Sequence, residues 1–336
     1  MHTITHAAAG PRGERLADSD LFALIARHGA VYLKGVVRNH EDFAALTDRV
    51  GHRWFDYPRR RRPTVSASAR IQTVSPGNGT ISPHAELSFS PYHPHLGGFC
   101  CIWAASEGGA TTLYDGCAVA ETMSAELRSY FAGRQFLYRG RWGFEEGFDR
   151  FGVEDEAALR RLIEEKGWED RLWIDGDMVV QKLFRPCFAH HAPTGREAFI
   201  THLVHLAKMR LPEAMIRRWL AARRRPPVAA RLGSKAARLI RKTTSRRDDR
   251  PIGVTAFPLL DDGSIVPGRI VRALHETIIR HEARVHWEAG DVVIFDNTRM
   301  MHGREAFSGQ ERVVLTRFGF PKSELPILSV GNEVAA

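Results

Sequence analysis

The chain has 336 residues, a hydrophobic share of 43% and a formal net charge of +9, which is enough apolar sequence for the core of one domain over residues 1–336. No apolar run reaches about 18 residues, and the opening "MHTITHAAAGPRGER" lacks the apolar centre of a signal peptide. These features argue against a membrane-spanning or secreted protein and predict a cytoplasmic location.

The first elements alternate between helix and strand. Residues 21–28 predict a short helix that Ser19 and Asp20 can cap and Gly29 can end. Residues 30–36 then predict a strand.

A second helix is expected over residues 41–50, because Asn39 can cap it and Gly51 can stop it. From there to about residue 120, short apolar runs alternate with Pro and Gly, which favours strands over helices.

Within this region "ISPHAELSFS", residues 81–90, predicts a buried strand with polar groups on one face. Side chains two positions apart leave the same face of a strand, so His84, Glu86, Ser88 and Ser90 are expected to point together. An unpaired buried carboxylate is costly, and a bound metal ion would remove that cost.

The cysteines show no CxxC pair, and adjacent ones would face opposite sides of a strand. Buried free thiols are therefore expected rather than a disulfide or a metal site. They are Cys100, Cys101, Cys117 and Cys187.

The middle of the chain is mixed. Residues 154–167 predict a helix, and residues 184–206 predict two strands around a turn at Thr194 and Gly195.

Residues 208–250 predict a basic helical insertion, with 15 Lys and Arg against three acids. Three interpretations stay open: a solvated helix face, a surface for an acidic carrier protein, or a nucleic-acid site. Nucleic acid is the least favoured, because Trp219 is the segment's only aromatic residue and a platform for stacking bases is missing.

Elements near the C-terminus are clearer. Residues 261–267 predict a turn, 268–282 a helix, and 283–287, 291–295 and 311–320 strands. Helices around a core of many short strands indicate an α+β fold with a jelly-roll (double-stranded β-helix) core and flanking helices.

A third candidate ligand stands in "FDNTRMMHGREAF", where His302 is expected on the loop that leaves an apolar strand. With His84 and Glu86 it would form a set of two histidines and one carboxylate, which holds ferrous iron on one face and leaves positions open. Arg312, ten residues later, has a planar fork of donors that suits a carboxylate.

With these motifs in order, the sequence resembles the taurine dioxygenase and clavaminate synthase-like family of iron(II) and 2-oxoglutarate-dependent oxygenases. The resemblance extends from "HGAVYLKGV" to "RVVLTRFGF" and rests on "PHAELSFSPYHP", "EGGATTLYDG", "DDGSIVP" and "WEAGDVVIFDNTRMMHGREAF". It implies Fe(II), 2-oxoglutarate and O2 as cofactor and cosubstrates.

Carried over residue by residue, the resemblance implies iron ligands at His84, Glu86 and His302. It also implies that Arg312 grips the distal carboxylate of 2-oxoglutarate and that Thr111 hydrogen-bonds it.

Two departures from the family pattern bear on these roles. The family's next arginine commonly lies four residues after the first, where this chain has Thr316, and a register slip could make Arg317 the anchor instead of Arg312. The carboxylate is Glu86 where many members have Asp, which resembles the branch that acts on amino acids and argues against halogenation.

Candidate substrate contacts surround these ligands. Ser88 shares the predicted face with Glu86, and His202 either lines the pocket or packs in the core. Asn297 and Arg304 flank His302, so they either shape its loop or touch substrate.

The implied function is hydroxylation of an unactivated carbon of a small amino acid, free or tethered to an acidic carrier protein, in specialised metabolism. The same chemistry can give desaturation or ring closure. The alternative from another class is a non-catalytic metal-binding or regulatory protein, and the sequence leaves the oligomeric state open.

Overall fold

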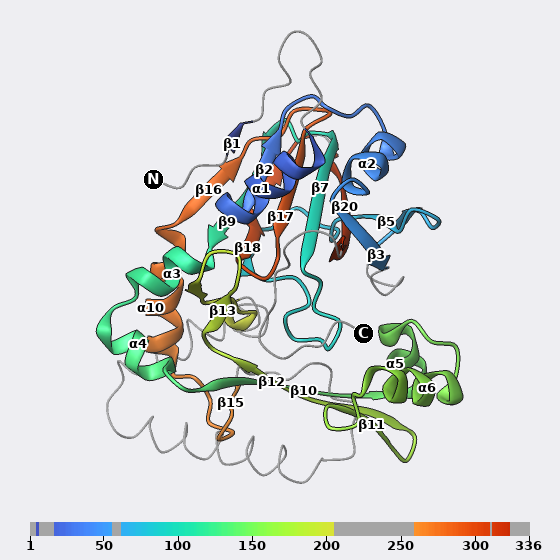
Figure 1. Cartoon of the computed structure of the whole chain (residues 1–336), viewed down its shortest axis with the longest axis vertical. Coiled ribbons are helices and arrows are strands. Elements are labelled where there is room, and N and C mark those ends of the chain that lie inside the picture. The colour runs from blue at the N-terminus through green and yellow to red at the C-terminus, as the bar shows by residue number, and fades with distance from the viewer. Residues whose placement is uncertain (1–4, 7–16, 56–61, 205–258, 310, 323–336) are drawn as a thin grey trace.

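The computed structural model describes residues 5–6, 17–55, 62–204, 259–309 and 311–322. The basic insertion predicted over residues 208–250 lies outside this part of the chain. Two facing β-sheets form the upper half of the molecule in Figure 1, and a third sheet with helices at both of its ends forms the lower half.

The larger of the two facing sheets is mostly antiparallel and has its central strand paired on both sides over long stretches. Its strands, in sheet order, are β1 (Thr5–His6), β2 (Ala30–Leu33), β17 (Val292–Asp296), β7 (Leu96–Trp103), β20 (Val313–Pro321), β5 (Ile71–Thr73) and β4 (Thr64–Ser66), with β3 (Gly51–Phe55) also on β20.

The smaller sheet faces the larger one across an apolar interior. Its strands, in sheet order, are β16 (Glu282–Val285), β9 (Thr111–Asp115), β18 (Met300–Arg304) and β6 (Ile81–His84). Phe99, Phe295 and Phe318 from the larger sheet form one cluster with Leu113 and Met300 from the smaller. Two sheets that share a core in this way are the predicted jelly-roll architecture.

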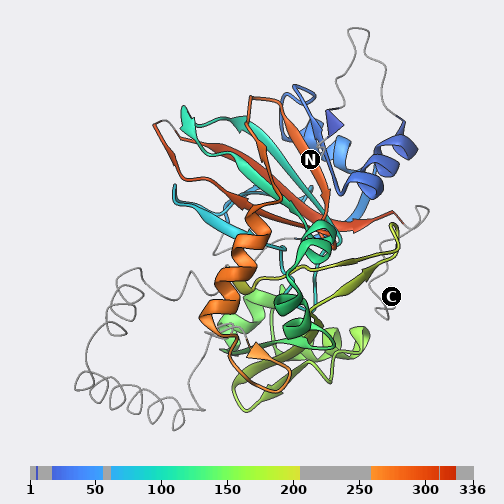
Figure 2. The ribbon, with the colours of Figure 1, turned by 90° about the vertical axis from the view of Figure 1, so that its left-hand side faces the viewer.

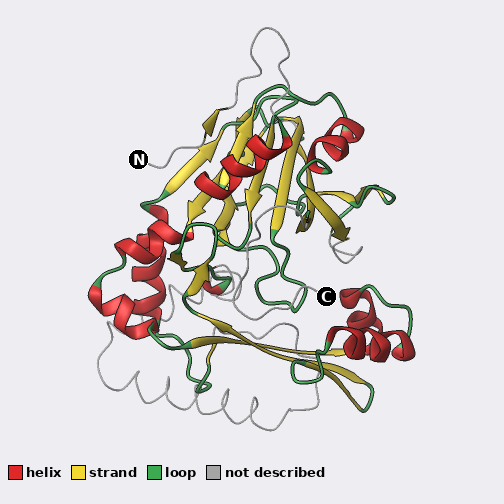
Figure 3. Cartoon of the chain, viewed as in Figure 1, coloured by secondary structure: helices red, strands yellow, loops and turns green. Residues whose placement is uncertain are grey.

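Two helices cover the outer face of the larger sheet (Figure 3), α1 (Asp18–His28) and α2 (His40–Thr47). Their apolar side chains, including Ile25 and Phe43, pack against Val31 and Ile294 of the sheet. The expected cap of the first helix is wrong: Ala17 occupies the N-cap position without a side-chain bond, whereas Gly29 ends the helix in the left-handed conformation.

The third sheet is built on a long antiparallel pair and has helices at each end, and Figure 2 shows the α3, α4 and α10 group connecting it to the two facing sheets. Its strands are β11 (Leu172–Asp175), β12 (Met178–Pro186), β10 (Gln135–Gly143) and β15 (Leu259–Leu260). The helices are α3 (Gly116–Thr122), α4 (Ala125–Phe131), α5 (Phe144–Phe151), α6 (Glu156–Lys166) and α10 (Gly268–Ile279). Two small two-stranded sheets complete the described part: the hairpin of β13 (Ala189–His191) and β14 (Arg196–Ala198), and the pair of β8 (Glu107–Gly108) with β19 (Phe307–Ser308).

Several sequence predictions are confirmed at the level of single elements. The helices expected over 41–50, 154–167 and 268–282 are α2, α6 and α10, and the two strands around Thr194 are the β13–β14 hairpin. All four cysteines are buried and free. Among the described residues, none of the helices has the length and apolarity needed to cross a membrane.

Candidate metal centre

The three predicted ligands come together inside the two-sheet core. His84 ends β6, and His302 lies directly opposite it on β18, so the two imidazoles stand side by side across one strand pair. One potential ligand atom from each of His84, Glu86 and His302 lies within 4.8 Å of the others, and all three residues are buried. His302 is therefore within a strand, and the expected loop position is wrong.

The segment after His84 turns instead of continuing as a strand. Residues 86–89 form a turn, and Leu87 has a φ of +52°, in the left-handed region. Ser88 and Ser90 are buried but do not continue the strand face that begins at His84, so the predicted common face ends there. The turn is what brings the Glu86 carboxylate back toward the two imidazoles.

Asn297 holds the backbone of this turn. Its Oδ1 accepts a hydrogen bond from the Glu86 amide at 2.9 Å, and its Nδ2 donates to the Glu86 carbonyl at 2.9 Å and to the Pro94 carbonyl at 2.8 Å. These bonds fill the polar atoms of the side chain, which supports the loop-shaping interpretation of Asn297 over contact with substrate.

The hydrogen bond made by His84 leaves one ring nitrogen for a metal. Its Nδ1 lies 2.9 Å from the Ser82 carbonyl, which can only accept, so Nδ1 carries the proton and Nε2 is the nitrogen whose lone pair can bind a metal ion. His202 packs edge-on against the His84 ring at 4.8 Å and also lies 3.1 Å from the Ala85 carbonyl through its Nδ1. It thus borders the centre, as the pocket-lining interpretation requires.

A buried arginine that the sequence analysis did not single out lies against the carboxylate ligand. Arg62 Nη2 donates to Glu86 Oε2 at 2.9 Å. Burial by itself would raise the pKa of the Glu86 carboxyl, but the charge of Arg62 and the neighbouring His84 and His302 hold it well below its ordinary value. The carboxylate is therefore ionised and ready to bind a cation.

The predicted cosubstrate anchors lie on the same interior face, further along β9. Leu113 pairs directly with His302, and Thr111 lies two residues before Leu113 on the same strand. The Thr111 side chain therefore faces inward, roughly 7 Å along the strand from Leu113. Arg312 donates to the Thr111 hydroxyl at 3.2 Å and to the Gly109 carbonyl at 3.0 Å. Burial and then the charge of Arg304 lower the pKa of Arg312 to about 10, which leaves it charged at neutral pH.

The structure does not bring Arg317 to this place. Its buried guanidinium lies against the C-terminal end of α2, where it donates to the Ala44 carbonyl, the Thr47 hydroxyl and Asp48. The pairing of β20 with β7 shifts register between Val313 and Val314, where Ile102 of β7 is passed over. Residues 314–319 then pair in unbroken register, and this shift does not turn Arg317 inward.

The guanidinium of Arg304 is also taken up by hydrogen bonds to the protein backbone. Its guanidinium donates to the backbone carbonyls of Ser75 and Gly79. These bonds support the loop-shaping interpretation, because they fix the chain beside β6.

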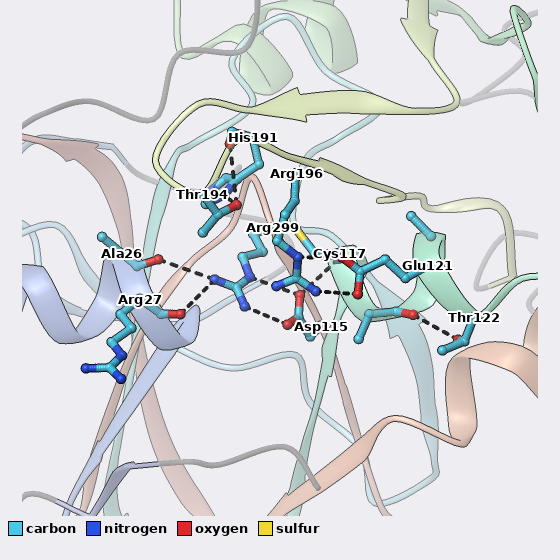
Figure 4. Close-up of polar contacts among 12 residues, drawn as sticks. Ala26, Arg27, Asp115, Cys117, Glu121, Thr122, His191, Thr194, Arg196 and Arg299 are labelled. Carbon is cyan, nitrogen blue, oxygen red and sulfur yellow. Dashed lines mark hydrogen bonds and ion pairs between the residues drawn. The ribbon is translucent and has the colours of Figure 1, made fainter.

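A second polar network fixes the segment that leads into β18 (Figure 4). Arg299 binds both carboxylate oxygens of Asp115, at 2.9 and 2.6 Å, and also donates to the carbonyls of Ala26 and Arg27 at the end of α1. A cavity of about 460 Å³ lies beside this network, but its lining includes none of the three candidate metal ligands.

The donor set fits a ferrous ion. It offers two imidazole nitrogens and one ionised carboxylate from a single side, which is the arrangement that leaves positions open for a cosubstrate and oxygen. Phe99, Phe295 and Phe318 surround the His302 ring with centroid distances of 5.1, 5.3 and 6.3 Å and exclude water from that side.

Comparisons with known proteins agree with this chemistry. Residues 7–318 match the taurine catabolism dioxygenase TauD, TfdA family. The dapdiamide synthesis protein DdaC of Enterobacter agglomerans is 23% identical over 312 residues, covering 90% of this chain and 86% of DdaC.

Solved structures share the fold. A taurine dioxygenase from Burkholderia xenovorans superposes with a TM-score of 0.52 at 14% identity, covering 95% of this chain and 86% of that one. AAD-2 in complex with Mn(II) and N-oxalylglycine gives a TM-score of 0.52 at 13% identity, covering 97% and 98% of the two chains.

Proposed function

Because the chain belongs to the taurine catabolism dioxygenase TauD, TfdA family and is thus an iron(II) and 2-oxoglutarate-dependent oxygenase, we propose that it hydroxylates an unactivated carbon of a small amino acid. The observation that carries the proposal is the buried His84, Glu86 and His302 cluster, with Arg312 and Thr111 on the adjoining interior face. The similarity to DdaC supports a role in specialised metabolism.

In this proposal each residue has a separate task. His84, Glu86 and His302 hold the iron, Arg312 grips the distal carboxylate of 2-oxoglutarate, and Thr111 hydrogen-bonds the same group. When bound, iron and 2-oxoglutarate supply the oxidising chemistry, in which O2 converts 2-oxoglutarate to succinate and carbon dioxide and one oxygen atom goes to the substrate.

The protein's own contribution is to position these groups and to exclude water. The Ser82 carbonyl fixes the tautomer of His84, and Asn297 fixes the backbone of Glu86, so the ligands are held in place before the metal arrives. His202 packs against the His84 ring, and Ser88 is buried two residues after Glu86, so these two side chains are the substrate contacts of the proposal.

Delivery by an acidic carrier protein remains part of the proposal. Its support is the excess of Lys and Arg in residues 208–250 of the sequence. A tethered and a free amino acid would meet the same metal centre.

The test combines product analysis with a ligand variant. Mass spectrometry of amino acids, free and carrier-loaded, incubated with iron and 2-oxoglutarate should show a gain of one oxygen atom, whereas desaturation or ring closure would show a loss of two hydrogens. Glu86→Ala should lose bound iron and succinate release, and unchanged succinate release would refute the assignment of the ligands. A non-catalytic binding protein would show no substrate-stimulated oxygen consumption.

A further inference from the structure

The cavity beside the Asp115 and Arg299 pair is separate from the metal centre. It has a volume of about 460 Å³, and its lining comes from the ends of α1 and α10, from α3 and from the strands β2, β9, β14, β16 and β18. Figure 4 shows α1 on one side of this pair and α3 on the other. A cavity of this size can hold a small organic molecule.

Positive charges outnumber negative charges around the cavity. Its three arginines face two carboxylates. Arg299 is paired with Asp115, and Arg196 is paired with Glu121 through two bonds. Arg27 remains, because none of the described residues forms a hydrogen bond or an ion pair with its guanidinium. The lining therefore has one positive charge in excess even while its histidines are neutral.

Some donors on this lining are free to bind a ligand. His28 follows Arg27 at the end of α1, and neither of its ring nitrogens has a hydrogen-bond partner in the described part of the chain. Arg196 uses Nε and Nη2 for Glu121 and leaves Nη1 unbonded within the same residues. Burial, with the charges of Arg27 and Arg299, lowers the pKa of His28, so the electrostatic potential there is positive. A bound anion would offset that potential.

The inner side of the cavity is apolar. Leu113 and Met300 line it and also belong to the core between the two sheets, whereas Arg27 is exposed to solvent. Three alanines add to the apolar lining. An inorganic anion would satisfy only the charged side, whereas an organic anion with a short hydrocarbon body would match both sides.

We infer that this cavity binds a small organic anion, whose phosphate or carboxylate group is held by Arg27, His28 and Arg196 and whose hydrocarbon body packs on Leu113 and Met300. The inference goes beyond the proposed function. It applies equally to a free and to a carrier-tethered substrate, because none of the metal ligands lines the cavity.

Isothermal titration calorimetry at two temperatures tests the inference. The protein is first loaded with Co(II) and 2-oxoglutarate in the absence of oxygen, so that the metal centre is filled. n-Butyl phosphate should then bind at one site per chain and roughly tenfold more tightly than methyl phosphate, because its additional methylene groups contact the apolar side. Pentanoate has a similar body with a carboxylate, so its affinity relative to n-butyl phosphate identifies the preferred charged group.

Two substitutions remove the proposed contacts to the charged group. Arg27→Gln should weaken the binding of the tighter probe roughly tenfold, and His28→Gln roughly threefold. Lys166→Gln is the matched control, because Lys166 is a cation in the last turn of α6, as Arg27 is in the last turn of α1, and it does not line the cavity. The control should bind the probe as the wild type does.

Three results would overturn the inference. The first is the absence of binding for n-butyl phosphate and for pentanoate at both temperatures. The second is an unchanged affinity in a variant that combines Arg27→Gln with His28→Gln. The third is an equal loss of affinity in Lys166→Gln, which would show that only the net charge of the protein matters. Circular dichroism verifies that each variant is folded, as expected for two side chains that make no bonds to the rest of the described structure.

Discussion

Replacing Asn297 with alanine tests whether the Glu86 ligand depends on a side chain that never touches the metal. The substitution removes three hydrogen bonds at once and leaves the amide and carbonyl of Glu86 and the carbonyl of Pro94 without these partners inside the core. Each unsatisfied buried group costs about 1 to 3 kcal/mol, and partial relaxation of the turn leaves a total loss of about 3 kcal/mol in the free energy of unfolding. Because the turn also sets the position of the carboxylate, metal affinity should fall roughly 10- to 100-fold.

Urea unfolding measures the first quantity, and titration with Co(II) measures the second. Asn39→Ala is the matched control, because this asparagine accepts a hydrogen bond from the Asp42 amide at the exposed start of α2. It should cost about 1 kcal/mol and leave metal affinity unchanged. If Asn297→Ala is destabilised but binds Co(II) within twofold of wild type, the turn does not position Glu86 and the reasoning is refuted.

Three further predictions address neighbouring features. Arg312→Lys should raise the KM for 2-oxoglutarate roughly 10- to 100-fold in steady-state kinetics. Arg317→Met should leave that KM unchanged and lower the free energy of unfolding by about 2 kcal/mol. If instead Arg317→Met raised the KM and Arg312→Lys did not, the two roles would be reversed. Burial raises the pKa of Asp115, but its bonds to Arg299 hold it below the ordinary value of 3.8. Asp115→Asn should therefore be about 3 kcal/mol less stable than wild type above pH 4, with the difference shrinking as the pH falls through the lower folded pKa; a difference that stays constant in acid would contradict the pairing. A methyl group at Gly97 would overlap two of the phenylalanine rings that flank the C-terminal histidine, so Gly97→Ala should cost about 1 to 3 kcal/mol in urea unfolding, and a neutral effect would show that this packing is loose.

The metal ligands could be predicted from the sequence because the residue types and their order along the chain are enough to indicate an iron site. His84 and Glu86 are two positions apart, and a histidine after a buried strand completes the set. Their relative positions could not be predicted in this way. The strand expected over residues 81–90 ends at His84, because the hydrogen bonds between Asn297 and Glu86 favour a turn over continued pairing.

Arg62 illustrates what spacing cannot show. It stands in the run "RRRR" and precedes Glu86 by 24 positions, and nothing in that pattern separates a buried arginine from its neighbours. The directions of Asn297 and Arg304 were equally hidden, since a polar residue next to a ligand can face the pocket or the backbone. Which of the two occurs depends on carbonyl groups more than 200 positions away in the chain.

The sequence analysis did not predict the long strand pair of the third sheet, and the reason is local. Gly140 and Gly143 interrupt β10, and glycine weakens the strand signal. In the structure the space where a Cβ of Gly140 would lie is taken by the indole of Trp142, so the glycine is required by packing.

The direct pairing of His302 with His84 makes ion affinity a reporter of correct topology. A shift of one residue in the register of these antiparallel strands would turn one imidazole to the opposite face of the sheet. A molecule folded in that register would therefore not bind the metal ion. All three metal-binding side chains come from two neighbouring strands and the turn that follows one of them. This small unit could be transferred to another antiparallel sheet by protein design.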